Sequence, residues 1–157
     1  SQMIDGQDKT KEQLVKEFVE LRRRFAELQA QELKYRQIVQ NSNSIILRMD
    51  TKGNVTFING YAQRFFGYHE KEILGKSVIG SIVPEKESSG RDLIAMITDI
   101  VENPEKHSTN ENENMRSNGE RVWIAWTNKA IIADDGRITE ILCIGNDSSK
   151  YKQQKSG

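Results

Sequence analysis

RVWIAWTNKAII, residues 121–132, contains both tryptophans of a chain in which aromatic residues make up only 7%. β-Branched and aromatic residues dominate the segment, which predicts a strand. Alternate side chains of a strand point to opposite faces of the sheet. One face would carry Val122, Ile124, Trp126 and Asn128, and the other Trp123, Ala125 and Thr127. Two tryptophans of opposite parity therefore predict a sheet that is covered on both sides.

Turn sequences on both sides of this strand predict antiparallel neighbours. The segments 117–120 and 133–137 are rich in Asn, Asp and Gly, which tight turns favour. They separate the central strand from predicted strands at about 109–116 and 138–147. Strands joined by such short connections pair antiparallel, so the three segments should form a meander.

An upstream hairpin is predicted from a second alternating segment. Ile45, Leu47 and Met49 share one parity, and Arg48 and Asp50 take the other. A turn at 50–54 then leads into a second strand, whose apolar residues are Val55 and Phe57.

Short helices are predicted between this hairpin and the last three strands. Breaks in the helical pattern fall at Gly67, Gly75, Gly80 and Pro84. A longer helix is predicted from Ser89 to Glu102, ending at Asn103-Pro104, with Leu93, Met96, Ile97 and Ile100 on one side. The middle segment is too short to be a domain, so it should pack on one face of the sheet. The predicted class is α+β: a five-stranded antiparallel sheet with short helices on one face, preceded by a long amphipathic helix.

Residues 9–40 form that predicted helix, because they lack Gly and Pro and their apolar residues recur with a heptad period. One row of the predicted dimer seam contains Leu14, Leu21, Leu28 and Tyr35, and the other contains Phe18, Phe25 and Val39. Lys11 and Glu32 interrupt the second row. The flanking positions carry Glu17, Arg22, Arg24, Gln29 and Arg36.

The apolar stripe of this helix needs a cover. Each exposed Leu or Phe forgoes roughly 1.5–3 kcal/mol of burial, and such a stripe is larger than monomers usually expose. A homodimeric coiled coil would cover it. The alternative is a helix that folds back against its own domain.

Composition excludes several classes of partner. The 157 residues carry 23 basic and 23 acidic side chains, so net charge indicates neither nucleic-acid binding nor membrane contact. No apolar run approaches the length of a membrane span, and no signal-peptide pattern is present. One cysteine is compatible with a reducing compartment, and we expect a cytoplasmic protein.

The ordered set of segments resembles the PAS domain family. The matching stretches are YRQIVQNSNSIILRMDTKGNVTFIN (35–59), FFGYHEKEILGK (65–76), NENENMRSNGERVWIAWTNKAII (110–132) and ILCIGNDSS (141–149). The resemblance implies a cytoplasmic sensor and dimerisation module upstream of a signalling effector. We expect a bacterial sensor histidine kinase, with a nucleotide cyclase or a transcriptional regulator as alternatives, or a purely structural dimerisation module without ligand.

The change in composition near residue 40 and the resemblance together predict the domain boundaries. Residues 1–8 would be a disordered tail, 9–40 the coiled-coil connector, 41–149 the PAS domain, and 150–157 the start of an output helix.

A ligand cavity is implied between the sheet and the helices. The candidate pocket residues are Met49, Phe57, Phe66, Leu74, Met96, Ile97, Ile124, Trp126, Asn128 and Cys143. Asn128 is the sharpest of them, because an inward-facing amide needs a hydrogen-bond partner. A ligand, a backbone group or a bound water would each satisfy it.

The cofactor is left open, although two kinds are disfavoured. Light-oxygen-voltage domains carry Gly-Arg-Asn-Cys where this chain has Gly75-Lys76-Ser77-Val78, so the adduct-forming thiol is missing. Haem-binding members place a histidine on the long helix, which has none here, and we expect both His69 and His107 to be solvated. No clustered ligands indicate a metal site. A small organic acid, a flavin without adduct chemistry, or no ligand at all remain.

Catalysis is not indicated. His69-Glu70 is similar to the phosphoacceptor dipeptide of histidine kinases, but Lys71-Glu72-Ile73 follows it in place of the expected Leu-Arg-Thr-Pro. The chain has no phosphate-binding glycine loop and no nucleophile elbow. We expect a regulatory fragment without enzymatic activity.

The end of the last strand carries a candidate signal relay. Asp147-Ser148-Ser149 stands where family members usually have Asp-x-Thr, whose polar contacts tie the sheet to the outgoing helix. A plain helix cap is the other interpretation. The relay residues would be Asp147 and Ser149.

Overall fold

The computed structural model describes residues 10–149 and has the predicted architecture of a five-stranded antiparallel sheet with short helices and a long N-terminal helix. Two units, residues 1–38 and 39–157, are each compact and are described separately. The predicted tail at 1–8 and the predicted output helix at 150–157 lie outside the described residues.

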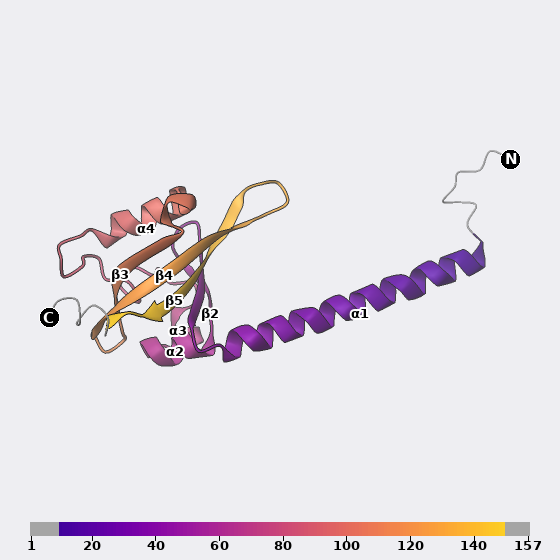
Figure 1. The fold of residues 1–157 in the computed structure, drawn as a ribbon, viewed down its shortest axis with the longest axis horizontal. Coiled ribbons are helices and arrows are strands. Elements are labelled where there is room, and N and C mark those ends of the chain that lie inside the picture. Colours follow the sequence, from indigo (N-terminus) through magenta and orange to yellow (C-terminus); the bar gives the residue numbers. More distant parts are fainter. Residues whose placement is uncertain (1–9, 150–157) are drawn as a thin grey trace. The chain divides into compact units, whose positions relative to one another are not determined.

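The long helix α1 spans Lys11–Asn41 (Figure 1). All six seam residues within the first unit are exposed, Leu21 by 64%. Val15, Val19, Leu33 and Ile38 are also exposed on this helix, although the heptad pattern did not place them on the seam. Intrahelical ion pairs join Arg23 to Glu20 and Glu27. Among the helices of residues 10–149, none has the length and apolarity needed to cross a membrane.

The sheet has the strand order β2-β1-β5-β4-β3, so the last strand lies at its centre (Figure 1). Its strands are β1 (Ile45–Asp50), β2 (Val55–Ile58), β3 (Thr109–Met115), β4 (Arg121–Ile132) and β5 (Ile138–Asp147). The predicted central segment 121–132 matches β4 residue for residue. The β4–β5 hairpin extends past the other strands.

The helical segments of the second unit are α2 (Gly60–Phe66), α3 (Glu70–Ile73), α4 (Leu93–Glu102) and the 3-10 turn η1 (Pro104–His107). The helix predicted from Ser89 begins at Leu93 instead. Asp92 caps it, because its side chain accepts a hydrogen bond from the Ala95 N–H. The residues before Leu93 belong to the loop 85–92, which lies along the edge of β3.

Burial confirms the predicted parity of β1 and β4. Ile45, Leu47 and Met49 of β1 are buried, as are Val122, Ile124, Trp126 and Asn128 of β4. Trp123 lies on the outer face and is only half-buried. The buried core therefore occupies one side of the sheet, between the strands and the helices.

The loop 85–92 covers the outer edge of β3. The Glu113 carboxylate accepts hydrogen bonds from the Ser88 N–H and hydroxyl and from Arg121, whose Nη1 lies 2.7 Å away. The Glu113 N–H in turn donates to the Glu87 carboxylate at 3.2 Å. An edge strand with occupied backbone groups is protected from pairing with another chain.

Glu113 gives the fold a measurable dependence on pH. Burial raises its pKa, but the hydrogen bonds from Arg121 and Ser88 outweigh burial, so the pKa lies below its ordinary 4.5. Its stabilising contribution is therefore complete above pH 4.5 and is lost as pH falls through the lowered pKa. We expect Glu113→Gln to lower the free energy of unfolding by about 1–2 kcal/mol at pH 7. Urea denaturation across pH 3–7 measures this.

The difference between Glu113→Gln and the unmodified chain should shrink at acidic pH. Glu120→Gln is the matched control, since Glu120 is exposed and pairs with Arg116 at 3.6 Å, so its loss should cost less than about 0.5 kcal/mol. An equal loss in both variants at pH 7 would contradict the assigned role of Glu113.

Candidate functional site

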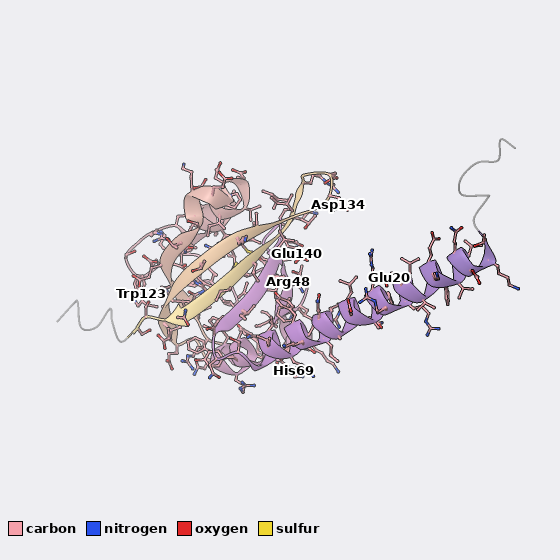
Figure 2. The ribbon with its side chains drawn as sticks, turned by 45° about the vertical axis from the view of Figure 1, so that its right-hand side comes forward. Glu20, Arg48, His69, Trp123, Asp134 and Glu140 are labelled. Carbon is pink, nitrogen blue, oxygen red and sulfur yellow. The ribbon has the colours of Figure 1, made fainter. Side chains whose placement is uncertain are left out.

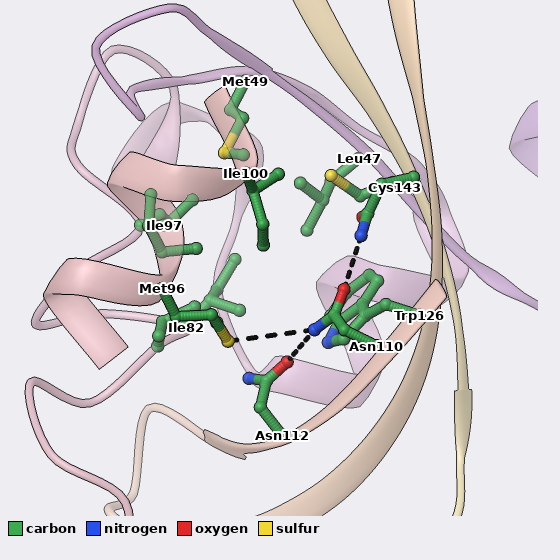
Figure 3. Close-up of a pocket in the computed structure, with 13 residues that line it drawn as sticks. Leu47, Met49, Ile82, Met96, Ile97, Ile100, Asn110, Asn112, Trp126 and Cys143 are labelled. Carbon is green, nitrogen blue, oxygen red and sulfur yellow. Dashed lines mark hydrogen bonds between the residues drawn. The ribbon is translucent and has the colours of Figure 1, made fainter. Parts of the chain in front are cut away.

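A cavity of about 30 Å³ lies between the sheet and α4 (Figure 3). Strands β1, β3, β4 and β5 form one wall, and α4 and the segment 78–83 form the other. The lining residues are Leu47, Met49, Val78, Ile82, Val83, Met96, Ile97, Ile100, Asn110, Asn112, Trp126, Asn128 and Cys143. Because a water molecule needs about 10–15 Å³ by this measure, the cavity has room for about two waters.

The cavity brings together Met49, Met96, Ile97, Trp126, Asn128 and Cys143 from the predicted pocket set. It does not include Phe57, Phe66, Leu74 or Ile124. Phe66 and Ile124 are fully buried elsewhere in the core, and Leu74 is 42% exposed after α3.

Phe57 lies on the outer face of the sheet. A register irregularity between Arg48 and Met49 pairs Phe57 with Arg48, whose guanidinium lies 5.0 Å from the centre of the Phe57 ring. Arg48 also pairs with Glu140 on β5 at 3.3 Å (Figure 2). The predicted alternation from Val55 to Phe57 therefore fails on this short strand.

A chain of hydrogen-bonded amides runs along the polar side of the cavity. Asn128 Nδ2 donates to Asn110 Oδ1, and Asn110 Nδ2 donates to Asn112 Oδ1 at 2.7 Å (Figure 3). Asn112 Nδ2 continues the chain to Asn114 Oδ1 at 3.3 Å. Asn128 was predicted to line the cavity, whereas the three amides of β3 were not, because this strand is polar at nearly every position.

Trp126 is held at both ends of its indole. Its Nε1–H donates to Asn114 Oδ1 at 3.1 Å. A Cβ built at Gly145, the β5 partner of Trp126, would lie 2.8 Å from ring atoms Cε3 and Cζ3. The indole therefore packs against bare backbone, and Gly145 provides the space.

The cavity wall carries no charge. None of its lining residues is acidic or basic, and burial raises the pKa of the Cys143 thiol to about 12. The thiol therefore stays neutral and unreactive, as expected for a buried structural cysteine.

Both histidines were predicted to be solvated. His69 is exposed, but His107 is partly buried and pairs with Asp99. His107 Nε2 lies 2.6 Å from Asp99 Oδ2, and the hydrogen bond from His107, followed by that from Asn103, lowers the pKa of Asp99. The His107 carbonyl also accepts a hydrogen bond from Asn128 Nδ2 at 2.8 Å. His69 caps α3, because its Nδ1 accepts a hydrogen bond from the Lys71 N–H.

The predicted relay residues form a compact set of contacts at the end of β5. The Ser149 N–H donates to Asp147 Oδ1 at 2.9 Å, while Ser149 Oγ accepts the Trp123 N–H at 2.8 Å. The Ser148 N–H donates to the Trp123 carbonyl at 2.8 Å. Both backbone groups of Trp123, which lies near the start of β4 (Figure 2), are thus hydrogen-bonded to residues 147–149, called the exit segment here.

Metal-binding clusters are absent from residues 10–149: no three His, Cys, Asp or Glu side chains are grouped to hold an ion.

Known proteins share this architecture. The family model described as PAS fold matches residues 33–148. The PAS domain of an HTR-like protein from Haloarcula marismortui has 18% identity and a TM-score of 0.62, covering 80% of this chain and 98% of that one. The PAS domain of a protein from Colwellia psychrerythraea has 20% identity and a TM-score of 0.62, covering 75% of this chain and 98% of that one.

A further similar structure is that of an RNA-binding light-oxygen-voltage receptor, with 17% identity and a TM-score of 0.61. The alignment covers 76% of this chain and 33% of the receptor. No curated protein matches the sequence.

Proposed function

Because the chain belongs to the PAS fold family, we propose that it is a signal-sensing module that binds a small ligand and relays binding to a downstream effector. The observation that supports this most directly is that β4 contributes residues both to the cavity and to the contacts at the end of β5. Trp126 and Asn128 line the cavity, and Trp123, on the same strand, is bonded to the exit segment.

The proposed relay runs along β4, because this strand contacts both the cavity and the exit segment. A ligand that repacks Trp126 or Asn128 shifts β4, and Trp123 transmits the shift to Ser148 and Ser149. Ligand binding changes the output only if the ligand has different affinities for two such arrangements. The chain's own residues therefore supply binding and coupling, and the family's members are generally sensory rather than catalytic.

The assembly proposed is a cytoplasmic homodimer joined through α1. The exposed Leu and Phe side chains of the seam support it, because pairing two helices removes them from water. The proposed effector is a histidine kinase in the same chain, with a nucleotide cyclase or transcriptional regulator as alternatives.

A structural dimerisation module without ligand is the second candidate function. The small cavity favours it, because about 30 Å³ leaves no room for an organic molecule without side-chain movement. Met49 and Met96 favour the sensor, since flexible thioether side chains repack readily around a ligand.

The contact between Ser149 and Trp123 can be tested by hydrogen exchange. We expect Ser149→Ala to speed exchange of the Trp123 amide about 2- to 10-fold, because the N–H loses its acceptor. Ser149→Thr keeps the hydroxyl and should preserve slow exchange. Equal exchange rates in both variants would refute the contact.

Hydrogen exchange at the Trp123 amide, measured before and after removal of a bound ligand, tests the proposed relay. Exchange at Trp123 should differ between the protein as purified and the same protein after unfolding, dialysis and refolding. Ser149→Ala should reduce that difference. If stripping a bound molecule leaves Trp123 exchange unchanged, the relay is wrong even though a ligand exists.

A further inference from the structure

The Met96 thioether, near the start of α4, is contacted by two hydrogen-bond donors. Arg91 Nη2 donates to Met96 Sδ, and Asn110 Nδ2 donates to the same sulfur at 3.9 Å (Figure 3). A guanidinium and a primary amide are strong donors, whereas a thioether sulfur is only a weak acceptor. Two strong donors are therefore directed at an atom that accepts hydrogen bonds poorly.

The guanidinium of Arg91 is held in this position by the loop 85–92 and by β3. Its Nη1 donates to the Glu111 carbonyl at 3.2 Å and lies 4.0 Å from the carboxylate of Glu87, which is buried. The Arg91 side chain is 43% exposed, whereas Met96 is only 8% exposed. The Met96 sulfur thus lies beneath a positioned surface cation, close to solvent.

Met96 also lines the cavity between the sheet and α4, which gives a small oxidant access to its sulfur. The volume of about 30 Å³ has room for about two waters, which matches the two oxygen atoms of hydrogen peroxide. None of the lining residues is acidic or basic, so the wall suits an uncharged molecule. A molecule of peroxide in this cavity would lie against the Met96 thioether.

Oxidation would convert the weak acceptor into a strong one. The thioether sulfur attacks one oxygen of hydrogen peroxide and the O–O bond breaks. A proton moves from the transferred oxygen to the leaving oxygen, so the products are a sulfoxide and water. A sulfoxide usually disrupts a core because it is polar. Here its oxygen would meet an arginine N–H and an amide N–H, and hydrogen bonds from charged donors are the stronger kind.

We propose that Met96 is a site of oxidation by hydrogen peroxide, and that Arg91 Nη2 and Asn110 Nδ2 hold the resulting sulfoxide oxygen. The oxidised chain stays folded. The change is reversible, because a methionine sulfoxide reductase reduces the sulfoxide with two thiols, which form a disulfide, and releases the oxygen as water. Asn110 accepts a hydrogen bond from Asn128, so oxidation at α4 also reaches β4. This goes beyond the proposed ligand sensing, since oxidation requires no bound ligand.

Peptide mass spectrometry of the full chain treated with hydrogen peroxide tests the site. In the folded protein we expect Met96 to be oxidised at least about tenfold faster than Met49, which lines the same cavity but is only 1% exposed, because oxidation follows access. In unfolding concentrations of urea the two rates should converge. Oxidation of Met96 no faster than that of Met49 in the folded chain would overturn the proposal.

The stability of the oxidised chain tests the role of Arg91. Oxidation should lower the urea midpoint of Arg91→Gln by about 1 M more than that of the unmodified chain, because the variant lacks the charged donor. Arg137→Gln is the matched control, since Arg137 is exposed and pairs with Asp135, and it should behave as the unmodified chain does. Met96→Leu measures the contribution of the other methionines. Equal losses in Arg91→Gln and the unmodified chain would overturn the assigned donors.

Discussion

Replacing Asn59 with leucine should lower the free energy of unfolding by about 3–5 kcal/mol, a large effect for a single polar side chain. The Asn59 side chain is fully buried and makes four hydrogen bonds. Its Nδ2 donates to the Val39 and Ser44 carbonyls, and its Oδ1 accepts from the N–H groups of Ile46 and Ala62. Leucine of similar size would leave all four backbone groups without these partners.

Asn59→Asp sharpens this test, because the carboxylate keeps the shape but faces two carbonyl oxygens. Burial and these acceptors favour the protonated form, so the variant should regain stability as pH falls. Asn146→Leu is the exposed control and should change stability by less than about 0.5 kcal/mol. Urea denaturation of the three variants measures the effects, and a loss below 1 kcal/mol for Asn59→Leu would contradict the assigned contacts.

Gly145→Ala should destabilise the fold by about 3 kcal/mol, at the upper end of the range for overpacking. The added Cβ would lie 2.7 Å from Ile124 Cγ2 and 2.8 Å from the Trp126 ring. The backbone of Gly145 is in an ordinary strand, so the cost arises from packing rather than from backbone strain.

A double-mutant cycle separates these causes. Trp126→Leu removes the ring atoms that the new methyl group would contact, so the two substitutions together should cost at least about 1 kcal/mol less than the sum of the single losses. Thermal or urea unfolding of the four proteins measures the coupling. Additive losses would show that Gly145 does not provide the space for the indole.

The fold and six of the thirteen cavity-lining residues were predicted from the sequence, in segments where the apolar residues recur regularly. Period-two alternation placed Met49, Trp126 and Asn128 on the inner face correctly, because long paired strands keep strict parity. Phe57 was misplaced because β2 is short and its register with β1 is irregular. Such an irregularity depends on tertiary pairing and leaves no local signal.

The amide chain was missed for a different reason. Strand β3 reads TNENENM and is polar at nearly every position, so hydropathy gives it no inner face. The parity of Asn110, Asn112 and Asn114 becomes informative only once their cross-strand partners on β4, such as Trp126, are known to be buried. His107 likewise looked solvated because its partner Asp99 belongs to a different element.

Native mass spectrometry of the protein purified from cells, before and after denaturation, tests the central claim most directly. The sensing account predicts a dimer carrying a reproducible extra mass that leaves on unfolding, and the extra mass identifies the size of the ligand. A dimer at the bare mass of two chains would support the structural dimerisation module instead. A monomer at bare mass would contradict both the proposed dimer and the proposed ligand.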